Sequence, residues 1–149
     1  MSDTDRIEKQ VVLKAPRSRV WRALTDAGEF GKWFGMTVEG SFQVGKTVGG
    51  NITYKGTPVR VEFTPEKIEP ETRFSYRWHP FALDPKMDYS KEPTTLVEFR
   101  LAEAAEGTLL TVVESGFDRI PQARRDEAFR MNDGGWTAQV RNIQRYVEG

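Results

Sequence analysis

The segment that follows Pro121 constrains the fold most, because it is the one long stretch of this sequence with the apolar period of an α-helix. The periodic positions are Phe129, Asn132, Trp136, Val140, Ile143 and Val147. Gly134 and Gly135 lie in the middle and cost a regular helix about 1 kcal/mol each relative to alanine. They indicate either a kink or a close approach of a ligand or loop to the backbone. A single helix must therefore cover whatever sheet the rest of the chain forms.

The sequence before that helix favours an antiparallel sheet, because short β-prone runs alternate with glycine, proline and charged pairs. A first strand is expected over residues 6–14. Two short helices follow, over 16–26 and 29–35, since Pro16 suits a first helical turn and Gly28 separates the two. Further strands are expected over 36–38, 47–54, 58–68, 73–79, 94–101 and 108–117. This order predicts one α+β domain over residues 1–149.

Alternation along the last three strands assigns their side chains to two faces. The inward set is Phe74, Tyr76, Trp78, Val97, Phe99, Leu101, Leu110, Val112 and Glu114, and the outward set is Arg73, Ser75, Arg77, His79, Glu98 and Arg100. The terminal helix has to cover the inward set. A twisted, curved sheet cannot touch one helix along its whole length, so we expect a cavity between them.

Large aromatics with a few polar groups are the usual lining of a small-molecule pocket. The expected lining residues are Tyr76, Trp78, Phe99, Glu114, Phe129, Asn132 and Trp136. A plainer interpretation is that the aromatics are core and that Glu114 is a structural acid, paired with an arginine or with water. Desolvation would raise the pKa of an inward carboxylate, which leaves an acid–base role for Glu114 as an alternative.

Residues 80–93 contain three prolines and no regular period, which predicts a long loop of the kind that often serves as a lid or binding loop. His79 precedes this loop and falls on the outer face by alternation. We expect a surface histidine there, with a position at a pocket mouth as the alternative. Arg124 and Arg125 are expected in a solvated helix start, with contact to a small anion as the alternative.

The composition excludes several classes of function. The chain has no cysteine and one histidine, so thiolate and multi-histidine metal sites are excluded and we expect no metal or cofactor. The 22 basic and 22 acidic residues balance, which disfavours nucleic acid and anionic membranes as partners. No apolar run suits a signal peptide or a membrane span, so a cytoplasmic protein is expected.

Five motifs in order resemble one family: VWRALTD at 20–26, KWF at 32–34, FSYRW at 74–78, VVESGF at 112–117 and GGW at 134–136. The chain is similar to the bacterial single-domain branch of the proteins named after the activator of the heat-shock-protein-90 ATPase. That branch lies within the START-like, birch-pollen-allergen-like superfamily. The resemblance implies a helix-grip fold, in which six or seven antiparallel strands curve around the last helix and two small helices follow strand one.

The resemblance implies several functions, because the superfamily includes lipid and hormone binders, cyclases, other enzymes and co-chaperones. We expect binding of a small hydrophobic or aromatic molecule. The first alternative is a cyclase- or dehydratase-like enzyme, in which Glu114 is the acid or base and Tyr76 orients a carbonyl. The second is a module that contacts a chaperone through the outer face of the sheet, a role that in the family relies on a separate amino-terminal domain. Monomer and homodimer both remain open.

Overall fold

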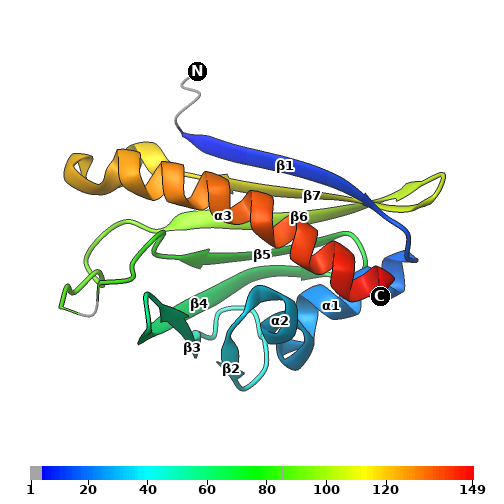
Figure 1. Ribbon diagram of the computed structural model, residues 1–149, viewed down its shortest axis with the longest axis horizontal. Coiled ribbons are helices and arrows are strands. Elements are labelled where there is room, and N and C mark those ends of the chain that lie inside the picture. Colours follow the sequence, from blue (N-terminus) through cyan, green and yellow to red (C-terminus); the bar gives the residue numbers. More distant parts are fainter. Residues whose placement is uncertain (1–4, 85) are drawn as a thin grey trace.

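The computed structural model describes residues 5–84 and 86–149 and has the helix-grip architecture that the sequence predicts (Figure 1). Its sheet has seven antiparallel strands in the order β1-β7-β6-β5-β4-β3-β2. The strands are β1 (Arg6–Leu13), β2 (Thr37–Glu39), β3 (Val48–Tyr54), β4 (Thr57–Glu69), β5 (Arg73–Trp78), β6 (Thr95–Ala104) and β7 (Gly107–Ser115). The helices are α1 (Arg17–Thr25), α2 (Ala27–Phe34) and α3 (Gln122–Glu148), with a 3₁₀ turn at Phe117–Arg119.

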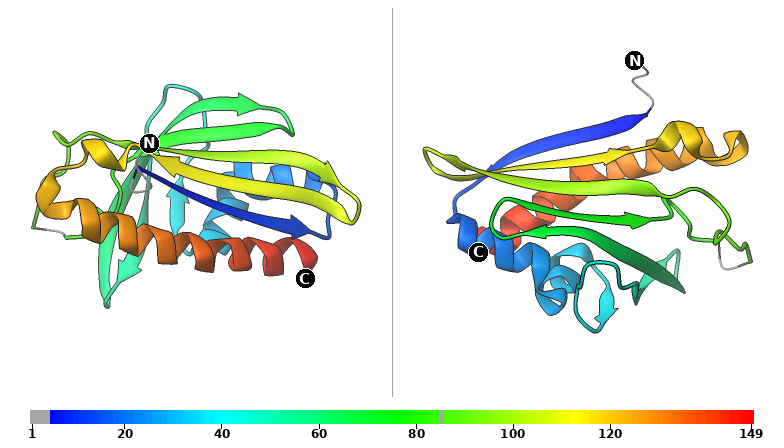
Figure 2. Two further views of the ribbon diagram at one scale, coloured as in Figure 1. Left: turned by 90° about the horizontal axis from the view of Figure 1, so that it is seen from above. Right: turned by 180° about the vertical axis from the view of Figure 1, so that it is seen from behind.

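The first strand returns to the end of the sheet. Strands β2 to β7 run as a meander, and β1 pairs with β7, with Ile7 opposite Glu114 and Val11 opposite Leu110. The helices α1 and α2 therefore follow directly after β1, at one end of that strand, and the meander begins after them. Figure 2 shows α3 lying across one face of the curved sheet.

Local chemistry explains the two short helices. The Asp26 carboxylate caps α2 by accepting a hydrogen bond from the Glu29 amide at 3.0 Å. Gly35 ends α2 at a φ of 87°, in the left-handed region that glycine enters without steric cost. Between these caps, Phe30 and Trp33 are buried, and the Trp33 indole donates to the Ala23 carbonyl at 2.8 Å. The two helices thus form one packed unit.

The core lies between α3 and the inward face of the sheet. Eight of the nine side chains predicted inward on β5, β6 and β7 are buried, and Trp78 is partly buried. On α3 the residues that close the core are Ala128, Trp136 and Ile143. The helix continues through Gly134 and Gly135, and a Cβ atom added at either position would meet nothing within 4 Å. Neither glycine is required by the packing of its neighbours.

The outward face carries paired charges. Glu98 is buried although alternation places it outward, because it forms ion pairs with Arg73 and Arg100 on either side. Arg77 pairs with Glu66 at 2.5 Å. No helix within residues 5–84 and 86–149 is long and apolar enough to cross a membrane.

Candidate functional site

A cleft of about 410 Å³ lies between the β3–β4 hairpin, the loop that follows β5, and α3 at Asn132. Its walls come from the end of α2, the β3–β4 hairpin, the end of β5, the loop that joins β5 to β6, and one residue of α3. The apolar lining residues are Phe34, Ile52, Val61, Trp78, Phe81, Ala82, Leu83, Met87 and Tyr89. The polar ones are Arg60, Glu62, His79, Asp88, Ser90 and Asn132. Aromatic rings therefore form much of this surface.

The β5–β6 loop, whose described residues are 79–84 and 86–94, forms one wall of the cleft. A second hollow of about 440 Å³, here called the outer hollow, lies between this loop, the turn of the β3–β4 hairpin and the start of α3. Phe81, Leu83, Met87 and Tyr89 border both the cleft and the outer hollow. The loop thus borders two open volumes.

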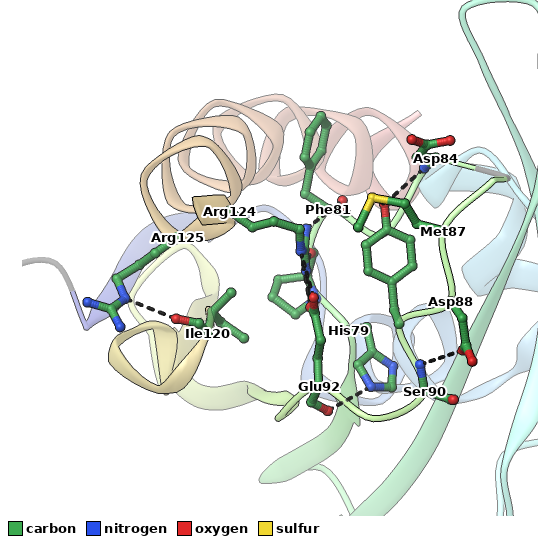
Figure 3. Close-up of polar contacts among 12 residues, drawn as sticks. His79, Phe81, Asp84, Met87, Asp88, Ser90, Glu92, Ile120, Arg124 and Arg125 are labelled. Carbon is green, nitrogen blue, oxygen red and sulfur yellow. Dashed lines mark hydrogen bonds and ion pairs between the residues drawn. The ribbon is translucent and has the colours of Figure 1, made fainter. Parts of the chain in front are cut away.

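Arg124 of α3 holds this loop in place (Figure 3). Its guanidinium donates to both oxygens of Glu92, with the shortest contact at 2.8 Å, and to the carbonyl oxygens of Pro80 and Phe81 at 3.1 Å each. The guanidinium carbon also lies 4.6 Å from the centre of the Tyr89 ring. The side chains of Arg124 and Glu92 are only 13% and 17% exposed, so this ion pair is better shielded than an ordinary surface pair.

The loop also carries its own bonds. The Asp88 carboxylate accepts from the Ser90 amide at 2.9 Å, and hydrogen bonds from Ser90 together with the nearby His79 lower the pKa of Asp88. The imidazole Nε2 of His79 lies 3.1 Å from the Glu92 carbonyl oxygen. Phe81 has a φ of 48°, which is costly for an aromatic residue and persists only where neighbours hold it. Arg124 supplies one such contact at the Phe81 carbonyl.

Behind the cleft, the Glu114 carboxylate accepts four hydrogen bonds. Trp78 Nε1 and Thr95 Oγ1 donate to Oε2 at 2.7 and 2.5 Å. Asn132 Nδ2 and Trp136 Nε1 donate to Oε1 at 2.9 and 2.8 Å. Both oxygens are fully engaged, and the donors come from β5, β6 and α3. The acid therefore ties the sheet to the helix.

Burial raises the pKa of Glu114, and the four hydrogen bonds act in the opposite direction. Burial and the nearby Glu114 charge also raise the pKa of Tyr76 well above its usual range. The Tyr76 hydroxyl is buried and has no hydrogen-bond partner among the described residues. This side chain serves packing more than polar chemistry.

The structure divides the seven predicted lining residues into three groups. Trp78 and Asn132 border the cleft. Tyr76, Phe99, Glu114 and Trp136 are buried behind it, in a core where the Trp136 ring lies 5.8 Å from Phe99 and 6.0 Å from Trp78. Phe129 packs against Phe117 at 5.2 Å and does not line the cleft. The open volume thus lies beside the first half of α3, at Asn132. Aromatic rings fill most of the space between α3 and the sheet.

Several cleft residues escaped the sequence reasoning. Ile52 and Val61 belong to strands whose faces were not assigned, and Phe81, Leu83, Met87 and Tyr89 lie in a loop without a period. Their apolar character within a proline-rich loop is the signal that could have found them. His79 borders the cleft, which matches the alternative for that residue. Arg124 was expected in a solvated helix start, but its side chain is largely buried and pairs with Glu92.

The described part of the chain contains no group of three or more histidine, aspartate or glutamate side chains that could hold a metal ion. Such a group would be needed for a metal centre built from carboxylates and one imidazole. The residues that line the site form an apolar cleft with scattered hydrogen-bonding groups.

Comparison with solved structures shows the same fold in bacterial proteins. Protein MLL2253 from Mesorhizobium loti is 22% identical, with a TM-score of 0.75 and coverage of 96% of each chain. The Aha1 dimer from Colwellia psychrerythraea is 18% identical, with a TM-score of 0.71 and the same coverage. DynU16, from the dynemicin biosynthetic locus, is 25% identical with a TM-score of 0.74, and the match covers 97% of this chain and 47% of that one.

Sequence comparison gives one further match. The model of the family described as "Activator of Hsp90 ATPase homolog 1-like protein" matches residues 14–148. No curated protein matches the sequence.

Proposed function

Because this chain belongs to the family of activator of Hsp90 ATPase homolog 1-like proteins, we propose that it binds a small apolar or aromatic molecule in the cleft. The observation that carries the proposal is the lining itself, which joins rings from α2, β5 and the β5–β6 loop with aliphatic side chains of β3 and β4 around about 410 Å³. Small-molecule sites typically measure about 300–1,000 Å³ and combine apolar walls with a few polar groups. The cleft meets both conditions.

Two of the predicted residues would contact the ligand directly. Trp78 offers a ring face, and Asn132 offers an amide, at the inner wall of the cleft. Glu114 receives a hydrogen bond from each of them, so their orientation is fixed before a ligand arrives. Tyr76, Phe99 and Trp136 would support this wall from behind. A wall held in advance loses less conformational entropy on binding.

The arrangement does not favour the acid–base alternative for Glu114. Four donors occupy its two oxygens, and its side chain is buried and absent from the cleft lining. A general acid or base must reach the proton it transfers, directly or through one water. Tyr76 is likewise buried and does not line the cleft. We therefore assign Glu114 a structural role.

The chaperone alternative gains no support from the outer face of the sheet. Several charges there are paired with each other, as Glu98 is with Arg73 and Arg100. A charged partner would have to break these pairs, at the cost of desolvating each group.

The test is binding of the neutral fluorescent probe N-phenyl-1-naphthylamine. The wild-type protein should enhance its emission with a saturable curve, and Ile52→Trp, which adds a large side chain inside the cleft, should weaken binding at least tenfold. Val12→Trp is the matched control, because Val12 is 43% exposed and lies outside the cleft. Equal affinities for the wild type and Ile52→Trp, or no saturable binding at all, would contradict the proposal.

A further inference from the structure

A narrow groove of about 80 Å³ lies beside the cleft, between α2, β5 and α3. Its lining residues are Phe34, Trp78, Asn132, Gly135, Trp136 and Gln139. Phe34, Trp78 and Asn132 also line the cleft, so the same three side chains border both spaces. A molecule lying against these three residues would meet the cleft and the groove together.

The groove depends on the glycine at position 135. Gly135 lies three residues after Asn132 and four before Gln139, which places all three on one side of α3. A side chain at 135 would project from that side into the groove. A side chain at 134 would project from another side of α3, because Gly134 lines neither the cleft nor the groove. Position 135 meets no neighbour that would exclude a Cβ atom, yet it lacks a side chain, at a helix cost of about 1 kcal/mol.

The walls of the groove are held in place. The indoles of Trp78 and Trp136 and the amide of Asn132 all donate to Glu114. The Gln139 amide donates to the Phe34 carbonyl oxygen at 2.9 Å, which joins α3 to the end of α2. The groove is therefore a fixed feature of the fold.

The same bonds leave the groove with an apolar surface. The Nε1 groups of both tryptophans are used by Glu114, and the Gln139 amide donates to Phe34 and accepts from Asn142 at 3.0 Å. What remains to face a guest is mainly ring surface and the Cα of Gly135. At about 80 Å³ the groove is about half the size of the roughly 150 Å³ apolar cavity known to accept benzene, which favours a chain over a ring system as its guest.

From this geometry, and resting on the proposed function, we propose that the groove is a second part of the same binding site. It takes the narrow aliphatic end of an elongated ligand whose ring-bearing body lies in the cleft. The ligand class is thus a small aromatic or alicyclic molecule with a short unbranched chain.

The experiment compares two probes that share one body, 2-dimethylaminonaphthalene acylated at position 6 with either a propionyl or a hexanoyl chain. The hexanoyl chain has three more methylenes than the propionyl chain, and burial of two of them should tighten binding of the hexanoyl probe to the wild type at least tenfold, since each contributes roughly a factor of four. Gly135→Leu should abolish this preference and leave the affinity for the propionyl probe unchanged. Gly134→Leu is the matched control, with the same substitution on another side of α3, and should keep the tenfold preference.

The outcomes separate the two proposals. A tenfold preference that persists in Gly135→Leu places the chain elsewhere and overturns the groove as a subsite. If the wild type binds both probes with equal affinity, the groove is also overturned as a subsite, but the cleft is still supported as a binding site. A wild type that binds neither probe contradicts the proposed function itself. Circular dichroism spectra of both leucine variants should match that of the wild type, because leucine favours helix more than glycine does.

Discussion

At the scale of single residues, Glu114 is the most consequential side chain in the core. Its buried carboxylate has no cation beside it among the described residues and accepts from four neutral donors, on Trp78, Thr95, Asn132 and Trp136. An indole N–H can only donate, so the two tryptophans need an acceptor opposite them. A carboxylate offers acceptor positions on both of its oxygens, which explains why an acid stands at this inward position.

Glu114→Gln should therefore destabilise the protein. The new amide nitrogen would face donors where an acceptor is needed, and at least one indole or hydroxyl would lose its partner. We expect a loss of about 2–4 kcal/mol in the free energy of unfolding, measured by urea titration. Glu103→Gln is the control, because that side chain is 81% exposed, and it should change the stability little. A loss below 0.5 kcal/mol for Glu114→Gln would show that the network contributes little.

Tyr76→Phe should leave the free energy of unfolding unchanged or raise it, in contrast to Glu114→Gln. The Tyr76 hydroxyl is buried without a partner among the described residues, and an unsatisfied hydroxyl costs desolvation energy. The variant should unfold at equal or higher urea concentration, with a gain of up to about 1 kcal/mol. A marked loss of stability in the same titration would show that the hydroxyl has a partner in solution.

At the scale of elements, Glu29 joins all three helices. Its carboxylate pairs with Arg19 at 2.7 Å and Arg22 at 2.8 Å on α1, and it accepts from the Tyr146 hydroxyl on α3 at 3.0 Å. Burial acts to raise the pKa of Glu29, but the hydrogen bonds and the two cations outweigh it and lower the pKa. A lowered folded-state pKa contributes stability above the unfolded pKa of about 4.3. That stability is lost as the pH falls through the folded value.

Glu29→Gln should therefore cost about 1–2 kcal/mol at pH 7, a modest value because the side chain is still 18% exposed. The difference from the wild type should begin to shrink as the pH falls below about 4.3, where the Glu29 carboxylate of the unfolded chain takes up protons, and it is lost as the pH falls through the lowered folded-state pKa. Urea titrations of both proteins between pH 3 and pH 7 measure it. A difference that is constant over this range would assign the effect to shape and not to charge.

Arg124 plays a comparable part for the β5–β6 loop, because its contacts with Glu92, Pro80 and Phe81 join that loop to α3 (Figure 3). Arg124→Ala should speed amide hydrogen exchange in the loop at least tenfold and leave the exchange of β6 and β7 unchanged. Arg125→Ala is the control, since its guanidinium donates to the Ile120 carbonyl at 3.1 Å and, within residues 5–84 and 86–149, makes no hydrogen bond to the loop. Equal exchange in the two variants would show that other contacts hold the loop.

At the scale of the whole molecule, the site draws on elements far apart in the chain, so a ligand should stabilise the entire fold. With N-phenyl-1-naphthylamine at ten times its dissociation constant, mass action adds about 1.4 kcal/mol. For a domain of this size that raises the unfolding temperature by roughly 3–6 °C, measured by scanning calorimetry. Ile52→Trp should show no such rise. A rise in both proteins would place the probe outside the cleft.

The fold could be predicted from the sequence because its determinants are periodic. The period of α3 and the alternation from Phe74 to Glu114 define the two surfaces that pack together. The position of the open volume could not be predicted, because it depends on how rings from different elements fill space. Trp136, Phe99 and Trp78 meet from α3, β6 and β5, and only their mutual distances show that they leave little room.

The cleft wall formed by the β5–β6 loop could not be predicted from local sequence patterns either. Arg124 and Glu92 are 32 residues apart, and nothing near either residue indicates that they pair. The loop has no period, so its apolar residues could not be assigned to the cleft or to solvent. Of the predicted site, Trp78 and Asn132 could be placed because they lie on regular elements.

The β5–β6 loop borders both the cleft and the outer hollow, through Phe81, Leu83, Met87 and Tyr89 alike. An outward displacement of these side chains would enlarge one chamber at the expense of the other, without disturbing a single strand pairing. The opposite flank is rigid, because Glu114 fixes Trp78 and Asn132 there. Discrimination between guests should rest on the contour of this rigid flank.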